Sequence, residues 1–468
     1  MIPMTLAEVA SVTGGRLSDA ALADVVVDGA VEHDSRRVGA GDLFLALEGE
    51  RVDGHRFAED VSAKGAVATL ATKEVPTAAI YVDDGIEALT KLASATARRT
   101  DAAIVGVTGS NGKTSTKDLI AAVCETAGPT VATRGNFNNE LGHPYTVCQV
   151  RPETRYLVLE ISARGIGHIR HLTEIAPPSI GAVLNVGISH LDGFGSIEKT
   201  AEAKSELPAA LPETGTAVLN ADDPRVAAMA DVTDARVLTF GRGEEPSIAA
   251  EDVDPRDGRH AFTLRAPDGS ARVELEVWGA HQVSNALAAA GVAHALGIPA
   301  EQTARALSGA PRRSERRMDV FTNPAGIAVI DDSYNANPAS MAGAVRSLAA
   351  LPAEGRRFAV LGLMADLEEL SEDEHRKIGA LAVELSIDRV IAVGEGTEPL
   401  AGAAGERARH VATQDEAVAI LAEEARPGDA VLAKGSRYRT WEVADFLRAQ
   451  TEAPAGYPAE DSQEEKIQ

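Results

Sequence analysis

Residues 103–119 constrain the fold more than any other stretch of this 468-residue chain. An apolar, β-branched run, AIVGVT, is followed by the glycine-containing loop GSNGKTS and then by the helix-like pattern TKDLIAAV. This order predicts a buried strand, a tight loop and a helix whose N-terminus presents unpaired backbone N–H groups and a positive dipole end. Because such a junction binds phosphate, we expect an anion site in an α/β sheet here.

Individual residues of the loop suit that chemistry. Gly109 and Gly112 have no Cβ, so backbone N–H groups can approach an anion closely. Lys113 supplies an ammonium for the outer phosphates, and the Thr114 hydroxyl suits Mg²⁺. The spacing differs from G-x-x-x-x-G-K-[ST], because Val107 stands where the first glycine would be. The loop is therefore a shorter variant of the phosphate loop, and a glycine turn without a ligand is the alternative.

Length and composition bound the rest of the architecture. A chain of 468 residues with 44% hydrophobic and 25% charged residues is typical of a globular protein of about two to four domains. It has neither an uncharged apolar run of membrane-spanning length nor a recognisable leader, which predicts a cytoplasmic protein without a membrane span. A formal net charge of −25 argues against nucleic-acid partners. Cys124 and Cys148 are too few for a disulfide framework.

The distribution of strand and helix patterns predicts three α/β domains followed by a tail. Residues 1–100 read as a small unit of short strands and helices. Residues 101–310 read as a doubly wound parallel sheet, with β-hairpins over 245–278. Residues 311–452 begin with the segment PRRS, which reads as a hinge, and form a second sheet with helices. Residues 453–468 combine proline with clustered acids and are expected to be disordered.

Polar side chains recur where the predicted strands end. Glu160 ends the strand RYLVLEIS, and His190 follows the strand SIGAVLNVG. Because the carboxyl ends of parallel strands meet at one edge of a sheet, we expect Glu160 and His190 to face the same crevice as Lys113. Mg²⁺ keeps several waters and takes phosphate oxygens, so Thr114, Glu160 and His190 are candidate ligands. A structural role for each of them is the alternative.

Further segments are candidate ligand contacts, each with an ordinary turn as the alternative. GNFNNELG contains Asn138 and Asn139, whose amides suit a polar substrate, a phosphate or a sugar. DDSYNANP, with Asp332, offers carboxylates for ribose hydroxyls or an amine, and Lys434 ends another strand of that domain. Lys204 lies in SIEKTAEAKSEL, where charges at i,i+4 spacing predict a solvated lysine on an exposed helix.

Taken together, these segments resemble the Mur ligase family, the ATP-dependent amide-forming enzymes of peptidoglycan synthesis. The resemblance covers the chain up to its tail. The segments GNFNNELGHPYT, DDSYNANPASM and DSRRVGAGDLFLALEG are similar to the member that adds D-alanyl-D-alanine to UDP-N-acetylmuramoyl-tripeptide. The D-N-P-R motif of the diaminopimelate-adding relative does not occur. The family-wide signals are TGSNGKTS, Glu160, His190, Asn285, Arg317 and Asp332.

The resemblance implies a UDP-sugar-binding domain, a central P-loop ATPase-like domain and a Rossmann-like C-terminal ligase domain. It also implies an ADP-forming ligation through an acyl phosphate, with ATP, two Mg²⁺ ions and a carbamylated Lys204, in a monomer. For ATP it implies Gly109, Ser110, Asn111, Gly112, Lys113, Thr114, Ser115, Asn285, Arg317 and Asp332. For metal it implies Thr114, Glu160, His190 and Lys204, and for substrate Ser35, Arg36, Asn138, Asn139, Asn335 and Asn337. Catalytic roles are implied for Lys113, Lys204, His190 and Asn139.

Three residues depart from the family pattern. Gln282 replaces a usual asparagine, Arg316 replaces a usual glycine, and Leu363 replaces a common acid. Two alternative functions stay open. Another amino-acid-adding Mur ligase would share every ATP residue, whereas a nucleotide-sensing P-loop regulator fits less well, because the strand after the loop ends in Glu160 rather than an aspartate. The third residue of the acceptor peptide, diaminopimelate or lysine, is also open.

Overall fold

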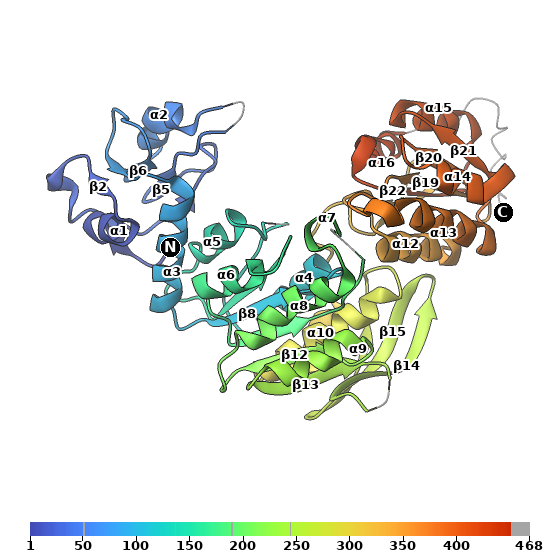
Figure 1. The fold of residues 1–468 in the computed structure, drawn as a ribbon, viewed down its shortest axis with the longest axis horizontal. Helices are drawn as coiled ribbons and strands as arrows, with labels where there is room; N and C mark the ends of the chain where they lie inside the picture. The colour runs from blue at the N-terminus through green and yellow to red at the C-terminus, as the bar shows by residue number, and fades with distance from the viewer. Residues whose placement is uncertain (50–51, 136, 189–190, 244, 451–468) are drawn as a thin grey trace, which may run out of the picture.

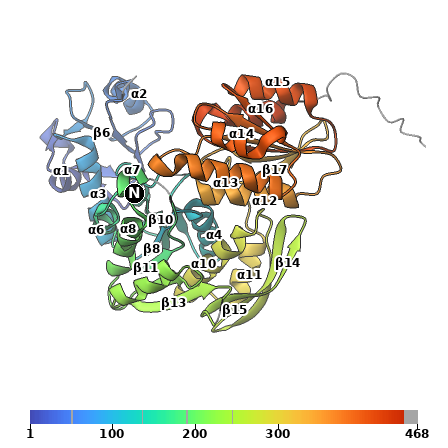
Figure 2. The same ribbon diagram turned by 45° about the vertical axis from the view of Figure 1, so that its right-hand side comes forward.

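The computed structural model describes residues 1–49, 52–135, 137–188, 191–243 and 245–450. The ribbon shows three parts, each with its own sheet (Figures 1 and 2). The N-terminal part, in blue, and the C-terminal part, in orange and red, lie above opposite ends of the central part. The predicted disordered tail falls outside the described residues.

Short apolar runs near the N-terminus form a five-stranded sheet in the order β2-β7-β6-β5-β4. Neighbouring strands are parallel except β2 and β7, and a separate antiparallel pair joins β1 to β3. The strands are β1 (Met4–Thr5), β2 (Arg16–Leu17), β3 (Val26–Val27), β4 (Val31–Glu32), β5 (Leu43–Leu45), β6 (Ala68–Ala71) and β7 (Ala79–Tyr81). The helices are α1 (Leu6–Thr13), α2 (Ala58–Ala63) and α3 (Gly85–Arg99).

The central sheet has nine strands in the order β16-β15-β14-β13-β12-β11-β8-β10-β9. Pairing is parallel from β9 to β14 and antiparallel from β14 to β16, which confirms the predicted hairpins. The strands are β8 (Ala103–Thr108), β9 (Thr130–Ala132), β10 (Tyr156–Glu160), β11 (Ile180–Val183), β12 (Thr216–Asn220), β13 (Arg236–Gly241), β14 (Ile248–Arg256), β15 (Arg259–Ala266) and β16 (Gly269–Glu274). The helices are α4 (Lys113–Glu125), α5 (Gly142–Val147), α6 (His168–Ile175), α7 (Leu191–Phe194), α8 (Ile197–Ala209), α9 (Pro224–Ala227), α10 (His281–Ala295) and α11 (Ala300–Ser308).

Alternate residues of the parallel strands face opposite sides of the central sheet. Leu157 and Leu159 of β10 belong to a core that also contains residues of α6 and α8, whereas Val158 belongs to a core with residues of α4 and α10. Strands buried on both faces read as continuous apolar runs, which is why the sequence shows them without alternation. The central part is therefore the doubly wound α/β sheet that the sequence predicts.

The C-terminal part is a second α/β sheet, in the order β17-β18-β22-β19-β20-β21, parallel except for β17. Its parallel strands follow the apolar runs predicted there. The strands are β17 (Asp319–Thr322), β18 (Ala328–Asp332), β19 (Arg357–Gly362), β20 (Arg389–Val393), β21 (Ala408–Val411) and β22 (Ala430–Lys434). The helices are α12 (Pro338–Ala350), α13 (Ser371–Glu384), α14 (Glu398–Ala404), α15 (Gln414–Glu424) and α16 (Trp441–Ala449).

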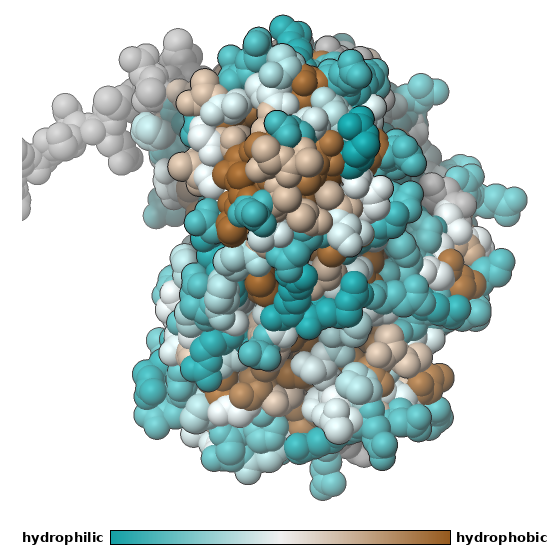
Figure 3. Space-filling model, turned by 90° about the vertical axis from the view of Figure 1, so that its left-hand side faces the viewer, coloured by the Kyte–Doolittle hydropathy of each residue, from teal (hydrophilic) through white to brown (hydrophobic). Residues whose placement is uncertain are grey.

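The surface on the N-terminal side is mixed in polarity. Hydrophilic side chains form most of its outline, and hydrophobic ones occur in separate patches (Figure 3). Within the described ranges, none of the helices combines the length and apolarity that crossing a lipid bilayer requires.

Candidate active site

The loop after β8 is held by residues that follow the neighbouring strand β11. The Asn111 N–H donates to Asn185 Oδ1 (2.8 Å), and Asn185 Nδ2 donates back to the Asn111 carbonyl (3.1 Å). The Ser110 hydroxyl donates to the Gly187 carbonyl (3.1 Å) and accepts from the Gly187 N–H (2.8 Å). Because both strands end at the same edge of the sheet, these contacts fix the loop between them.

Gly112, the last residue of the loop, packs against α10. Its φ of 81° disfavours any side chain, and a Cβ there would lie 2.5 Å from Asn285 Oδ1. Asn285 is buried, and its Nδ2 donates to Gln282 Oε1 over 2.9 Å. Gln282, the longer substitute for the usual asparagine, therefore holds the Asn285 amide against the loop.

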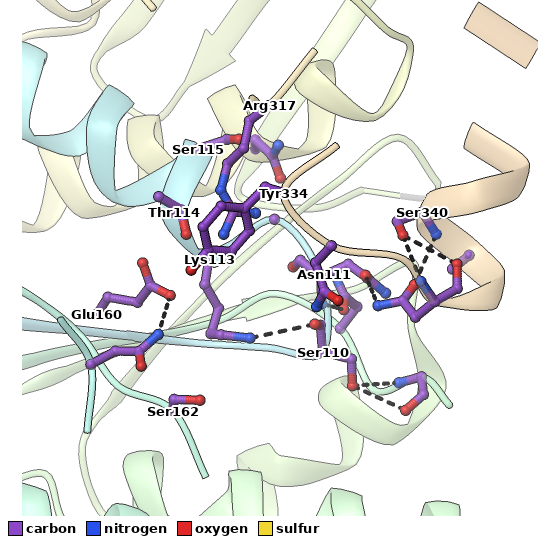
Figure 4. A pocket seen from close by; sticks show the side chains of 18 of the residues that line it. Ser110, Asn111, Lys113, Thr114, Ser115, Glu160, Ser162, Arg317, Tyr334 and Ser340 are labelled. Atoms are coloured by element: carbon purple, nitrogen blue, oxygen red, sulfur yellow. Dashed lines mark hydrogen bonds between the residues drawn. The ribbon is translucent and has the colours of Figure 1, made fainter. Parts of the chain in front are cut away.

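Lys113 begins α4, and its side chain turns back over the loop (Figure 4). Nζ donates to the carbonyls of Gly109 (2.7 Å) and Ser110 (3.4 Å). Burial lowers the pKa of Lys113, the Glu160 carboxylate opposes that shift, and the Arg317 guanidinium adds to it. The structure thus brings Lys113 and Glu160 to one crevice, as expected from their strand ends.

Two buried oxygens in this crevice suit a hard cation. Among the described residues, Thr114 Oγ1 and Glu160 Oε2 have no hydrogen-bond partner, whereas Glu160 Oε1 accepts from Asn138 Nδ2 (2.7 Å). Buried oxygens without partners are costly unless a ligand satisfies them, and oxygen is the donor that Mg²⁺ prefers. The described part of the chain has no group of three His, Cys, Asp or Glu side chains arranged for a metal. His190, the other candidate ligand, lies outside the described residues.

Asn139 has a local structural contact in addition to its place at the crevice. Its Oδ1 accepts from the Gly142 N–H (2.9 Å), next to the start of α5, and its backbone carbonyl accepts from the His143 N–H (2.9 Å). This contact helps to fix the loop that carries Asn138 beside Glu160.

The opposite wall comes from the C-terminal part. Asp332 Oδ2 pairs with the buried Lys434 Nζ (2.5 Å), and Oδ1 accepts from the Met318 N–H (3.0 Å). The Arg317 guanidinium lies over the Tyr334 ring, 4.1 Å from its centroid (Figure 4). Lys434, which ends β22, thus neutralises the carboxylate that ends β18.

A hydrogen bond joins the phosphate loop to the C-terminal part directly. Asn337 Nδ2 donates to Asn111 Oδ1 over 2.6 Å. Asn337 is also the N-cap of α12, where its Oδ1 accepts from the Ser340 N–H (2.9 Å). The backbone carbonyl of Asn335 accepts from Lys434 Nζ (2.9 Å).

These walls enclose a cavity of about 680 Å³ between the central and C-terminal parts. His281 and Tyr334 also line it, although no sequence pattern predicted a role for either side chain. Burial lowers the pKa of His281, which favours its neutral form. The predicted residues that line the cavity are Ser110, Asn111, Gly112, Lys113, Thr114, Ser115, Asn138, Asn139, Glu160, Asn285, Arg317, Asp332, Asn335 and Asn337.

Lys204 is buried, so the solvated lysine predicted from charge spacing is wrong. It is 4% exposed and shares the buried face of α8 with Thr200, Ala203 and Leu207. Burial lowers the pKa of Lys204 to about 7, and the Lys113 ammonium contributes. Of the acidic residues between these positions, Glu202 is exposed, whereas Glu206 is buried and accepts from the backbone N–H groups of Gly167 and Arg170. The i, i+3, i+4, i+7 spacing from Thr200 was the signal that could have found this burial.

Within the described residues, Ser35 and Arg36 stand apart from the lining of this cavity. Arg36 pairs with Asp34 over 2.9 and 2.7 Å, and the Ser35 carbonyl accepts from Lys64 Nζ (2.6 Å). These contacts lie in the N-terminal part, and the predicted nucleotide contact there stays a prediction.

Besides Gln282, the other two departures from the family pattern are Arg316 and Leu363, and the structure shows the surroundings of both. Arg316 has a φ of 56°, a conformation in which glycine is free of strain. Leu363 follows β19 and lines a separate hollow of about 410 Å³ with Arg437 and Tyr438. An acid at position 363 would have faced that hollow, not the large cavity.

Comparisons with known proteins agree with this architecture. Three family models match: "Mur ligase family, catalytic domain" over residues 29–102, "Mur ligase middle domain" over 107–293, and "Mur ligase, glutamate ligase domain" over 316–437. The chain belongs to the Mur ligase family.

Two relatives of this Mur ligase with high identity share a name. UDP-N-acetylmuramoyl-tripeptide–D-alanyl-D-alanine ligase of Mycobacterium tuberculosis is 46% identical over 93% of this chain and 96% of its own length. The Escherichia coli enzyme of that name is 36% identical over 86% and 89%.

Solved structures show the same fold. MurF from Acinetobacter baumannii has a TM-score of 0.84 at 30% identity, covering 95% of this chain and 99% of that one. MurF ligase from Thermotoga maritima in complex with ADP has a TM-score of 0.77 at 29% identity, covering 90% and 97%.

Proposed function

We propose that this Mur ligase joins D-alanyl-D-alanine to UDP-N-acetylmuramoyl-tripeptide, with ATP converted to ADP and phosphate. The product is the pentapeptide precursor of peptidoglycan. The observation that carries the proposal is the cavity in which the phosphate loop, two unpartnered oxygens and the C-terminal Arg317 face one another. The relatives named for this reaction support it along nearly the whole chain.

The reaction has two steps. The terminal carboxylate of the tripeptide attacks the γ-phosphorus of ATP, the bond to ADP breaks, and an acyl phosphate forms. The amine of the dipeptide then attacks the acyl carbon, and inorganic phosphate leaves as the amide forms and the amine loses its protons. The protein contributes mainly by positioning the reactants and neutralising charge.

Residues of the cavity divide this work by position. In the free protein the Lys113 ammonium donates to the loop carbonyls. When ATP binds, Lys113 leaves these carbonyls and donates to the outer phosphates instead. Arg317 and Asn285 contact the nucleotide from the two sides of the cavity, and Asp332 accepts from its ribose. Asn138 and Asn139 donate to the phosphoryl group and the acyl acceptor.

Mg²⁺ would be held by Thr114, Glu160 and His190, and it supplies charge neutralisation at the phosphates. The two unpartnered oxygens of this chain fit that ion. Lys204, buried near the Lys113 ammonium, fits a carbamate, because a lowered pKa provides the neutral amine that combines with CO₂. The resulting negative charge would offset the nearby ammonium and accept a second Mg²⁺.

We also propose that the three parts of the molecule divide the substrates between them. The N-terminal part, residues 1–100, would hold the uridine nucleotide through Ser35 and Arg36. The central part, 101–310, would hold ATP, and the C-terminal part, 311–452, would present the dipeptide. The Arg36 side chain, already oriented by Asp34, supports this assignment of the N-terminal part.

Phosphate release tests the function. Purified protein is given ATP, Mg²⁺ and UDP-N-acetylmuramoyl-tripeptide, and then D-alanyl-D-alanine, diaminopimelate, lysine, D-glutamate or L-alanine in separate reactions. We expect release only with the dipeptide, and a product heavier than the acceptor peptide by one dipeptide less water. Release with a single amino acid in place of the dipeptide would favour another amino-acid-adding Mur ligase. Running both the diaminopimelate and the lysine tripeptide decides which acceptor is used.

A further inference from the structure

Arg317, which faces the cavity, is carried by a backbone turn with two unusual residues. Arg316 has a φ of 56° and Met318 a φ of 48°. Both values lie in the left-handed region, which residues with a side chain adopt only when surrounding contacts hold them there. The position of Arg317 therefore depends on what stabilises its two neighbours.

Within the described ranges, the hydrogen bonds of Arg316 are made with the C-terminal part. The Arg316 guanidinium donates to both carboxylate oxygens of Asp445 (3.0 Å each) and to the Trp441 carbonyl (3.2 Å), at α16. The Arg316 carbonyl accepts from the Tyr334 N–H (3.1 Å), and Tyr334 is the ring on which Arg317 lies (Figure 4). The Arg316 side chain and backbone thus tie α16 to the stacked pair.

The residues just before this turn are tied to the central part instead. Arg313 pairs with Glu125 over 2.7 and 2.5 Å, and the Ser314 hydroxyl donates to Asp118 (2.6 Å). Both acids belong to α4, the helix that Lys113 begins. Arg313 and Ser314 are therefore bonded to the central part, whereas Arg316 is bonded to the C-terminal part. The contacts of Arg316 thus hold Arg317 in the C-terminal wall of the cavity.

The arginine at 316 has charged neighbours that would remain if it were replaced. The buried Asp331 carboxylate lies 4.0 Å from Arg316 and 3.9 Å from Arg448. Arg448 also pairs with Asp319 (2.6 Å), which Arg312 contacts as well (2.8 Å). Since Arg448 still faces Asp331, loss of the Arg316 side chain does not leave that buried acid without a cation, and the fold should tolerate it.

We propose that Arg316 is a positioning residue for nucleotide binding. Its ion pair with Asp445 stabilises the left-handed backbone that glycine would adopt freely, and so keeps Arg317 on Tyr334, facing the cavity. An arginine with an acidic partner thereby takes the place of the usual glycine. The proposal rests on the use of ATP proposed above.

Four variants test it: Arg316→Ala, Asp445→Ala, Arg316→Gly and the double variant Arg316→Gly/Asp445→Ala. The two alanine variants keep the unfavourable φ but lose the ion pair, so we expect the KM for ATP to rise about tenfold, with kcat within about twofold. Arg316→Gly removes the strain together with the pair, so its KM should rise less than about threefold. The double variant should match Arg316→Gly, because without the arginine Asp445 has nothing to hold.

Arg305→Ala is the matched control, because Arg305 also pairs with an acid, Glu301 (2.7 Å), on the exposed face of α11 outside the cavity. Its KM for ATP and melting temperature should equal those of the wild type. The KM for UDP-N-acetylmuramoyl-tripeptide is measured for every variant and should stay unchanged, and the melting temperature should move by no more than about 4 °C.

Equal effects of glycine and alanine at 316, an unchanged KM in Asp445→Ala, or a melting temperature that falls in step with ATP affinity would each overturn the proposal. Wild-type protein that fails to use ATP would instead refute the proposed function, so the two failures are distinguishable.

Discussion

Replacing Gly112 with alanine should weaken both the fold and the binding of ATP. At φ 81° an alanine costs about 1–2 kcal/mol, the usual penalty of a left-handed residue with a side chain. The new Cβ would also lie 2.5 Å from Asn285 Oδ1, so the contact must lengthen by about 0.5 Å to reach the 3.0 Å below which real Cβ contacts are essentially never seen. Asn285 is held by Gln282 at 2.9 Å and cannot withdraw without breaking that bond.

The two costs are separable by a matched control. Gly297, at the end of α10, has a φ of 74°, but a Cβ there would meet nothing within 4 Å. Gly297→Ala should therefore lose only the conformational term, about 1–2 kcal/mol of unfolding free energy, and keep its affinity for ATP. Gly112→Ala should lose at least that much stability and, in addition, at least about tenfold in ATP affinity, the equivalent of about 1.4 kcal/mol. Calorimetric titration with a non-hydrolysable ATP analogue and chemical denaturation measure the two quantities. Wild-type affinity in Gly112→Ala, or an equal loss in both variants, would refute the packing argument.

Three other substitutions probe separate contacts. Thr114→Val removes an unpartnered oxygen, so we expect the Mg²⁺ concentration for half-maximal rate to rise at least about tenfold, with an unchanged KM for the acceptor peptide in a Mg²⁺ titration. Lys204→Ala should lower kcat by orders of magnitude, and small carboxylates added to the assay should partly restore it; full activity without them would remove the carbamate from the proposal. Asn337→Ser keeps an N-cap oxygen but loses the donor to Asn111, and loss of about 1 kcal/mol predicts a rise of about fivefold in the KM for ATP, which steady-state kinetics would detect.

The strand-end residues were within reach of sequence reasoning because the physics that positions them is local. An apolar run ending in a glycine loop and a helix start can hardly fold otherwise, and parallel strands bring their carboxyl ends to one edge. Lys113, Thr114 and Glu160 therefore line one cavity as their positions along the chain suggested. Asp332 and Lys434 end neighbouring strands, and they meet for the same reason.

Residues whose environment depends on packing between distant elements were harder to place. The prediction of an exposed Lys204 is wrong because it relied on the charged residues next to it in sequence. Its burial is set instead by the strands that α8 covers. In the sequence, Arg316 is visible only as an arginine where the family usually has glycine. Its left-handed backbone and its contact with Asp445 depend on the fold, because the two residues are far apart along the chain. The role of Tyr334 could not be predicted from sequence, because its ring becomes a stacking surface only where the fold brings the Arg317 cation onto it.

Residues of both the central and the C-terminal part line the cavity. Nucleotide binding is therefore coupled to the relative position of these two parts. Asn111 is held by Asn185 on the central side and by Asn337 on the C-terminal side, so the phosphate loop contacts both walls. Arg317 belongs to the C-terminal wall, because Arg316 is anchored there. If ATP contacts both walls, it must bind more tightly when they are correctly placed, and by reciprocity bound ATP must favour that placement to the same degree. Contacts outside the cavity, such as Arg316 with Asp445, therefore influence nucleotide affinity without touching the nucleotide.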